Sequence, residues 1–124
     1  GGMVEGDETL EQTVIRETIE EAGIRLINPQ KVGEILFQFQ TDEQDHLVHF
    51  FRAEDYEGTL QESDEMKPEW FHIDNIPYEQ MWADDKYWLP LFLEGKKFRG
   101  RFIFNKEFQI ANYQLKEVKD FSLK

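Results

Sequence analysis

The residues best suited to chemistry are three glutamates near the start of the chain, Glu17, Glu20 and Glu21. On a helix, Glu17 and Glu21 lie one above the other, and Leu10 and Val14 continue the same strip, so both carboxylates extend a partly buried face. Like charges four residues apart cost roughly 0.2–0.5 kcal/mol, and more when water is partly excluded. A divalent cation would reverse that repulsion. Because the ligands would be oxygens and the chain has no cysteine, the pattern favours a hard ion, Mg²⁺ or Mn²⁺.

The segment that carries these glutamates has the signals of a helix with two defined ends. Thr9 and Gln12 form a capping-box pair, which predicts a helix start, and Gly23 can take the left-handed conformation that ends a helix. Taken alone, a Glu-x-x-Glu-Glu run is most often a solvated helix face, and Arg16 beside it is most often part of a surface ion pair. The residues around the run decide between the two interpretations.

Further residues stand at fixed offsets from the glutamates. The full pattern is Gly2, Glu8, Arg16-Glu17, Glu20-Glu21, Gly23 and Ile24. Chance would give such a match about 10⁻⁷ times per start position, and a solvated face needs neither glycine. The pattern resembles the Nudix box, the signature of hydrolases that cleave a nucleoside diphosphate linked to another group. Two positions depart from the family's preferences, because Thr18 replaces an aliphatic residue and Met3 stands where lysine is common.

The resemblance implies a metal site and a hydrolytic mechanism. The implied ligands are Glu17, Glu20, Glu21 and Glu65, with a backbone carbonyl of Gly1 or Gly2. Arg16 is expected to orient the carboxylates by pairing with Glu8 or with a glutamate of the helix. Mg²⁺, for which Mn²⁺ can substitute, would neutralise the phosphates and activate water. Which glutamate acts as the general base is left open.

The resemblance extends beyond the box to almost the whole chain. It includes Lys31-Val32-Gly33, Phe37-Gln38-Phe39, Glu62-Ser63-Asp64-Glu65-Met66, Trp70-Phe71, Ile76-Pro77, Met81-Trp82, Asp84-Asp85, Tyr87-Trp88, Phe98–Phe104 and the closing Tyr113-Gln114-Leu115-Lys116-Glu117-Val118. These segments are similar to the MutT-like branch of the family, which hydrolyses 8-oxo-dGTP and, as a further candidate, 2-oxo-dATP. The implied products are the nucleoside monophosphate and pyrophosphate.

A guanine-type base presents donors at N1 and N2 beside an acceptor at O6. Asp84 and Asp85 could serve all three if one of them is protonated, and two carboxylates in a dry pocket raise at least one pKa. Trp82 would stack on the base. The walls of this pocket are expected to be Phe37, Phe39 and Met66. The alternative is that the two aspartates only cap the following helix and that Trp82 and Trp88 belong to the core.

Composition limits the partners. The net charge of −12 argues against binding a nucleic-acid polymer, so the expected partner is a small-molecule nucleotide and the expected state a monomer. No apolar run approaches the ~20 residues that span a bilayer, and no membrane partner is expected. The absence of cysteine is compatible with the cytoplasm, with a targeting segment ahead of the chain left open. The residues His46, His49 and His72 share no metal-pair spacing and are expected to be structural.

The remaining pattern alternates strands and helices. Strands are expected at Lys31–Gln40, His46–Glu54, Glu69–Ile73, Phe98–Phe104 and Ile110–Val118, and a helix at Asp84–Leu93 with Pro90 in its first turn. This order predicts an α/β fold, and the resemblance implies a single Nudix domain over residues 1–124, an α/β/α sandwich with a mixed sheet. In that fold about three strands precede the box. The chain is therefore expected to lack its N-terminal strands and to belong to a longer protein.

Two other functions compete with this interpretation. One is a Nudix pyrophosphatase that acts on another nucleoside diphosphate derivative, such as a nucleotide sugar. The other is a non-catalytic module that binds nucleotides or a partner through a decayed box, although all the metal-binding glutamates are present. A substrate panel separates the first from hydrolysis of oxidised purines, and Mg²⁺-dependent release of pyrophosphate separates the second.

Overall fold

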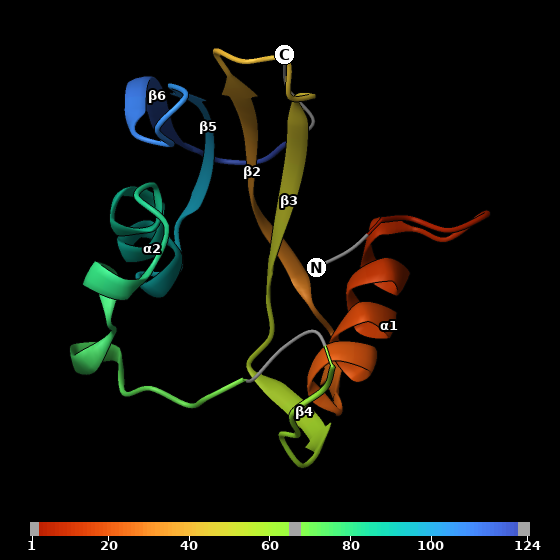
Figure 1. Cartoon of the computed structure of the whole chain (residues 1–124). Helices are drawn as coiled ribbons and strands as arrows, with labels where there is room; N and C mark the ends of the chain where they lie inside the picture. The colour runs from red at the N-terminus through yellow and green to blue at the C-terminus, as the bar shows by residue number, and fades with distance from the viewer. Residues whose placement is uncertain (1–2, 65–67, 122–124) are drawn as a thin grey trace. The chain divides into compact units, whose positions relative to one another are not determined.

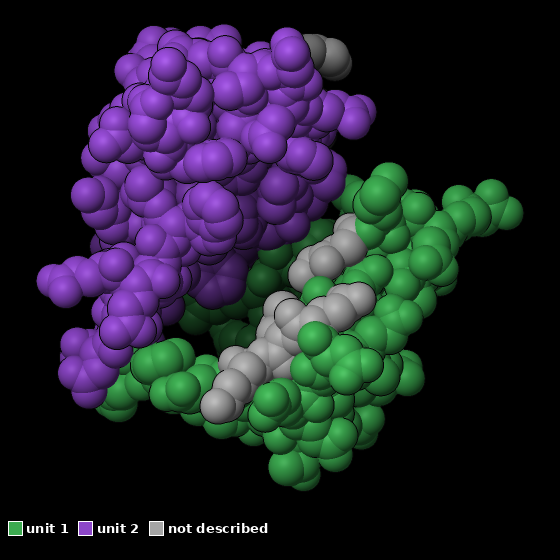
Figure 2. Space-filling view, viewed as in Figure 1, with its two compact units in different colours: residues 1–31, 51–72 green, residues 32–50, 73–124 purple. Residues whose placement is uncertain are grey.

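The computed structural model describes residues 3–64 and 68–121. It divides into two compact units, each built from two stretches of chain. Unit 1 comprises Gly1–Lys31 and Phe51–His72, and unit 2 comprises Val32–Phe50 and Ile73–Lys124, as the colours of Figure 2 show. No helix within the described residues is long and apolar enough to cross a bilayer.

Unit 1 begins with helix α1 (Leu10–Ala22), and both of its ends follow the sequence signals. The Thr9 Oγ1 accepts a hydrogen bond from the Gln12 N–H at 3.1 Å, and the Gln12 Oε1 accepts one from the Thr9 N–H at 2.9 Å. Gly23 ends the helix with a φ of 76°. The predicted capping box and glycine stop are therefore confirmed.

A two-stranded antiparallel sheet follows α1 in unit 1. Strand β1 (Ile24–Ile27) pairs with β4 (Asp55–Gly58), so that Ile24 lies opposite Gly58. Gly58 has a φ of +99°, and a Cβ atom there would lie 2.8 Å from the Gly23 carbonyl oxygen. Only glycine fits this crossing without strain. The sequence did not predict this pair, because four-residue strands are too short for alternation to be visible.

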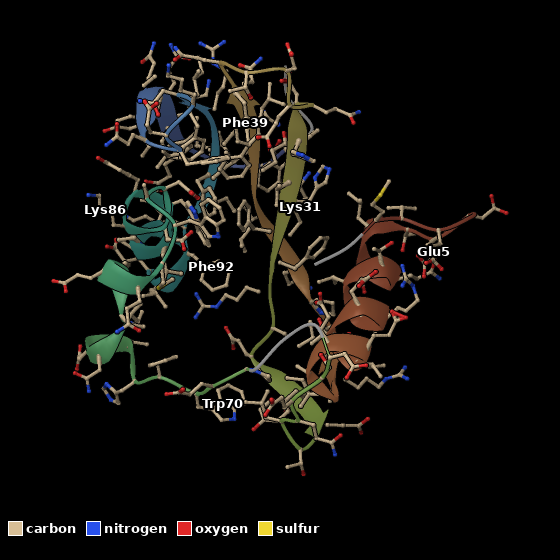
Figure 3. The ribbon with its side chains drawn as sticks, viewed as in Figure 1. Glu5, Lys31, Phe39, Trp70, Lys86 and Phe92 are labelled. Carbon is tan, nitrogen blue, oxygen red and sulfur yellow. The ribbon has the colours of Figure 1, made fainter. Side chains whose placement is uncertain are left out.

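The predicted strand at Glu69–Ile73 is wrong. The described residues there form no strand, and a 3₁₀ turn, η1 (Ile73–Asn75), begins at the last of them. Trp70, labelled in Figure 3, is 61% exposed, and its ring packs on Tyr56 with 5.3 Å between the ring centroids. The aromatic and β-branched residues that suggested a strand thus lie largely at the surface, without a buried face to pair them.

A four-stranded sheet, most of which belongs to unit 2, has the strand order β3-β2-β5-β6 (Figure 1). The strands are β2 (Gln30–Phe39), β3 (His46–Arg52), β5 (Lys97–Phe104) and β6 (Ile110–Val118). β2 and β5 run parallel, with Gly33 opposite Phe98, whereas β5 and β6 run antiparallel. The sheet is therefore mixed, as predicted, and all four strands match expected segments to within about two residues.

The core of unit 2 is aromatic. Ile35, Phe98 and Phe102 are fully buried, and Phe104 is nearly so. Gly33 leaves room for the Phe98 ring, because a Cβ atom at position 33 would overlap it. Residues of helix α2 (Asp85–Leu93) pack against this core: Tyr87, Trp88, Leu91 and Phe92.

Pro90 lies inside α2 rather than in its first turn, which corrects the prediction. The helix begins at Asp85, so the proline occupies its sixth position. Pro90 lacks the N–H that would reach the Lys86 carbonyl, and both residues lie at exposed positions where water can serve that group.

Candidate functional site

Arg16 organises the acidic group of unit 1, and all five of its N–H donors are used. Its Nε and Nη2 form a bidentate pair with Glu8, at 2.8 Å to Oε2 and 3.1 Å to Oε1. Nη1 donates to Glu17 Oε1 and to Glu20 Oε2, each at 3.0 Å, and Nη2 also reaches the Met3 carbonyl at 3.0 Å. A planar guanidinium can fix several carboxylates in this way. The expected pairing of Arg16 with Glu8 and with helix glutamates is confirmed.

The carboxyl group of Glu8 is held in its ionised form. The hydrogen bond from Arg16, followed by one from the Glu5 N–H, lowers the pKa of Glu8 from 4.5 to about 2. The same contact raises the pKa of Arg16 further above its usual value. Glu5 lies in the segment before α1 (Figure 3). Thr13, a buried hydroxyl that the sequence did not single out, donates to Glu8 Oε1 at 3.1 Å.

The three glutamates of the box differ in exposure. Glu17 and Glu21 are partly buried, as the strip predicted, whereas Glu20 is exposed. Within residues 3–64 and 68–121, no three carboxylate or imidazole groups gather closely enough to hold an ion. By donor type the set fits a hard divalent cation, since all three side chains are carboxylates that project from neighbouring turns of one helix. The guanidinium of Arg16 already bridges Glu17 and Glu20, so two of the three are aligned.

Four residues of the predicted site lie outside the described residues: Gly1, Gly2, Glu65 and Met66. Their predicted roles as metal ligands and, for Met66, as a wall of the base pocket stay predictions.

Unit 2 holds the predicted base-recognition residues around the start of α2. Asp84 is 5% exposed, and its Oδ2 accepts a hydrogen bond from the Trp88 Nε1 at 2.8 Å. It occupies the N-cap position, but its side chain makes no capping hydrogen bond. Trp82 is 67% exposed, whereas Trp88 packs against the core. The alternative interpretation therefore agrees with the structure only in placing Trp88 at the core. Asp84 makes no capping hydrogen bond with its side chain, and Trp82 is exposed.

The neighbouring carboxyl group, Asp85, is easier to protonate than usual. Partial burial, followed by the charge of Asp84, raises the pKa of Asp85 from 3.8 to about 6. Hydrogen bonds from Trp88 and from the Trp82 backbone oppose the rise without cancelling it. Two adjacent acids thus present one group that readily accepts a proton, which is the direction that the sequence predicted. At pH 7 the free protein holds that proton in only a minority of molecules.

The two phenylalanines predicted as pocket walls lie on β2. Phe37 stacks on Phe102 and Phe104, with centroids 6.1 and 6.2 Å apart. Phe39, labelled in Figure 3, packs on Phe104 at 5.8 Å and meets Phe108 edge-on at 6.3 Å. Both belong to the aromatic layer of unit 2.

Phe108 is a residue that the sequence analysis missed. Its ring also meets Trp82 edge-on, with centroids 6.2 Å apart and planes at 73°. Beside these two rings lies an open hollow of about 320 Å³, lined by Gln80, Met81, Trp82, Ala83 and Phe108. The only signal in the sequence was a phenylalanine in the polar turn between the last two strands.

Two of the three histidines contact other side chains of the sheet. His46 meets the Phe39 ring edge-on at 6.2 Å, and the His49 Nδ1 lies 3.7 Å from Glu34 Oε2. Glu34 is itself paired with Arg99 at 2.7 Å. His46 and His49 thus belong to contacts within the sheet, as expected.

Two vertebrate proteins are similar to this chain over almost its whole length. The oxidized purine nucleoside triphosphate hydrolase of Danio rerio is 48% identical over 120 residues, which span 97% of this chain and 77% of that protein. The protein of the same name from Mus musculus is 44% identical over 121 residues, spanning 98% of this chain and 78% of the relative.

A solved structure and a family model agree with these relatives. The crystal structure of a mutator MutT protein from Bacillus halodurans matches with a TM-score of 0.86 at 29% identity, covering 93% of this chain and 78% of that one. The model of the NUDIX domain matches residues 1–92. The α/β architecture, the mixed sheet and the box of glutamates on α1 therefore have one explanation: the chain belongs to the NUDIX family.

Proposed function

We propose that this protein hydrolyses oxidised purine nucleoside triphosphates, such as 8-oxo-dGTP, to the monophosphate and pyrophosphate. The observation that carries the proposal is the pair of acids at the start of α2. Asp84 is buried and hydrogen-bonded to Trp88, and Asp85 has a raised pKa. The vertebrate relatives, at 44–48% identity, carry this activity in their names.

The acid pair suits a guanine-type base. An ionised Asp84 accepts hydrogen bonds from N–H donors of the base, and a protonated Asp85 donates one to O6. A base that displaces water from Asp85 raises its pKa further, so substrate binding favours the protonated form. The exposed indole of Trp82 offers a stacking face, which is worth about 1–3 kcal/mol per base in comparable sites.

The phosphate chemistry is assigned to α1. Glu17, Glu20 and Glu21 would hold Mg²⁺, with Glu65 and a carbonyl of Gly1 or Gly2 as further ligands. A bound Mg²⁺ would supply charge to neutralise the phosphate chain and would make water a better nucleophile. Arg16 donates hydrogen bonds to the Glu17 and Glu20 carboxylates and keeps them aligned, while Glu8 holds Arg16 in place. The negative net charge is compatible with a nucleotide that arrives with its own Mg²⁺.

The test is a substrate panel: 8-oxo-dGTP, dGTP, 2-oxo-dATP and a nucleotide sugar, each with and without Mg²⁺. Pyrophosphate release and the monophosphate product are measured. The proposal expects kcat/KM for 8-oxo-dGTP to exceed that for dGTP, with no turnover when the metal is chelated. Preferred cleavage of the nucleotide sugar would assign a different Nudix substrate, and an inert protein that still binds nucleotides would make it a binding module.

A further inference from the structure

Phe108 occupies a backbone conformation that phenylalanine rarely adopts. Its φ is +59°, in the left-handed region that favours glycine or asparagine. It stands in the turn between β5 and β6, where a hairpin of this length normally places glycine. Phe108 is also 46% exposed, so burial of its ring offsets only part of the energetic cost of the strained backbone. A strained residue near a binding face calls for a functional explanation.

The turn does not need the aromatic ring to hold its shape. Asn105 Oδ1 accepts hydrogen bonds from the N–H groups of Glu107 at 3.0 Å and Gln109 at 2.9 Å. The Asn105 N–H donates to the Gln109 carbonyl at 2.9 Å, and the Phe108 N–H donates to the Asn105 carbonyl at 3.0 Å. These contacts involve the Asn105 side chain and the backbone alone. Glycine at position 108 would therefore leave the turn intact and relieve its strain.

The ring of Phe108 instead contacts two residues of the base site. It meets Trp82 edge-on at 6.2 Å and Phe39 edge-on at 6.3 Å. Trp82 is otherwise largely exposed, and an exposed indole can turn about its side-chain bonds. An edge-to-face contact with Phe108 restricts that rotation and leaves the indole oriented beside the hollow that both rings line.

We propose that Phe108 is a positioning residue of the base site, which orients the Trp82 ring for stacking on the purine and lines the hollow beside that ring. The inference rests on the proposed function and deepens it. A pre-oriented ring lowers the entropic cost of stacking, so the benefit falls on binding rather than on phosphate chemistry. The hollow, at about 320 Å³, lies at the lower end of the volumes usual for small-ligand sites.

The experiment compares Phe108→Gly, Phe108→Tyr and wild type in steady-state hydrolysis of 8-oxo-dGTP and dGTP by the full chain, together with thermal melts. Phe108→Gly should raise KM for 8-oxo-dGTP by about threefold to tenfold, with kcat nearly unchanged, since edge-on aromatic contacts have roughly that value. Its melting temperature should hold or rise, because glycine suits the turn. Phe108→Tyr, which keeps the ring, should restore KM. Lys106→Gly, in the same turn, is the matched control and should leave KM unchanged.

Each outcome decides between distinct explanations. If Phe108→Gly keeps the wild-type KM while wild type prefers 8-oxo-dGTP, the inference is overturned and the proposed function stands. If KM rises only together with a lowered melting temperature, and Phe108→Tyr does not restore it, the ring is structural and the inference is wrong. Wild-type protein that neither hydrolyses nor binds 8-oxo nucleotides overturns the proposed function and this inference with it.

Discussion

The two acidic groups of this protein, one on α1 and one at the start of α2, use the same side chains in opposite ways. At α1 the carboxylates form ion pairs with Arg16, which lowers the pKa of Glu8 to about 2. At α2 no cation pairs with Asp84 or Asp85 in the contacts described, and burial beside a like charge raises the pKa of Asp85 to about 6. In the first group Arg16 holds the Glu8 carboxylate as an anion and pairs with Glu17 and Glu20, an arrangement that suits metal and phosphate chemistry. The second can hold a proton, which suits recognition of a base.

The largest expected effect comes from the α1 group. Glu17→Gln and Glu21→Gln, made separately, should lower turnover of 8-oxo-dGTP by about two orders of magnitude or more, because each amide removes a charge from the proposed metal ligands. The helix should survive, as far-ultraviolet circular dichroism would show. Glu11→Gln, in the first turn of the same helix, is the control and should stay active. Wild-type turnover in both variants would remove the metal assignment.

The α2 group should act on recognition instead. Asp84→Ala and Asp85→Ala should each lower kcat/KM for 8-oxo-dGTP by about one to two decades, because a base donor or acceptor then loses its partner in a desolvated site. The Mg²⁺ dependence should not change, which distinguishes these variants from those on α1. Normal binding of 8-oxo-dGTP by both variants would mean that the base pocket lies elsewhere.

Protonation of Asp85 gives binding a pH dependence. Affinity for an oxidised guanine nucleotide should weaken as pH rises past about 6, since the donor to O6 is lost. Asp85→Asn keeps an N–H donor at every pH, so its affinity should be flat over the same range. Isothermal titration with the monophosphate product, from pH 5 to 8, measures both proteins without turnover. A flat profile in wild type would contradict the shared-proton picture.

The smallest expected effect is on stability. The two groups should change the free energy of unfolding with pH in opposite directions. Glu8 has a lowered pKa, so its contribution is present above the ordinary value of 4.5 and is lost as pH falls toward about 2. Asp85 has a raised pKa, so the folded state is favoured most below 3.8 and loses stability as pH rises to about 6. Denaturant melts should show Glu8→Gln flattening the acid side and Asp85→Asn flattening the slope between pH 4 and 6. If either substitution changed stability in the pH range assigned to the other residue, the two groups would not titrate independently and the contrast between them would be wrong.

The sequence predicted best where the cause is local. The capping pair Thr9 and Gln12, and the stop at Gly23, act within a few residues, and the helix ends as expected. The long strands β2, β5 and β6 have enough residues for their patterns to be read. The short pair β1 and β4 escaped notice because each depends on a partner about thirty residues away. The strand predicted at Glu69–Ile73 failed for the opposite reason: its residue types favour a strand, but the described residues there do not pair with another strand.

The residues of the site show the same difference between what local sequence predicts and what depends on the tertiary fold. The family resemblance pointed to Glu17, Asp84 and Asp85 as chemical groups and implied the pairing of Arg16 with Glu8 or a helix glutamate, which the structure shows. The hydrogen bond from Trp88 to Asp84 and the contact of Phe108 with Trp82 could not be predicted in the same way. Both depend on which side chains the tertiary fold brings together, and in the second case on a backbone angle that phenylalanine seldom adopts.

The parallel pairing of β2 with β5 has a consequence for how the protein reaches its native state. Glu34 on β2 and Arg99 on β5, joined at 2.7 Å, are 65 positions apart in the chain. The hairpin of β5 and β6 closes across a short turn, whereas β2 can join only after a long loop closes, at a large cost in chain entropy. The segment from Trp82 to Asp85 lies within that loop. We therefore expect the hairpin to order early during folding, and the segment proposed to recognise the purine to become ordered late, when β2 pairs with β5.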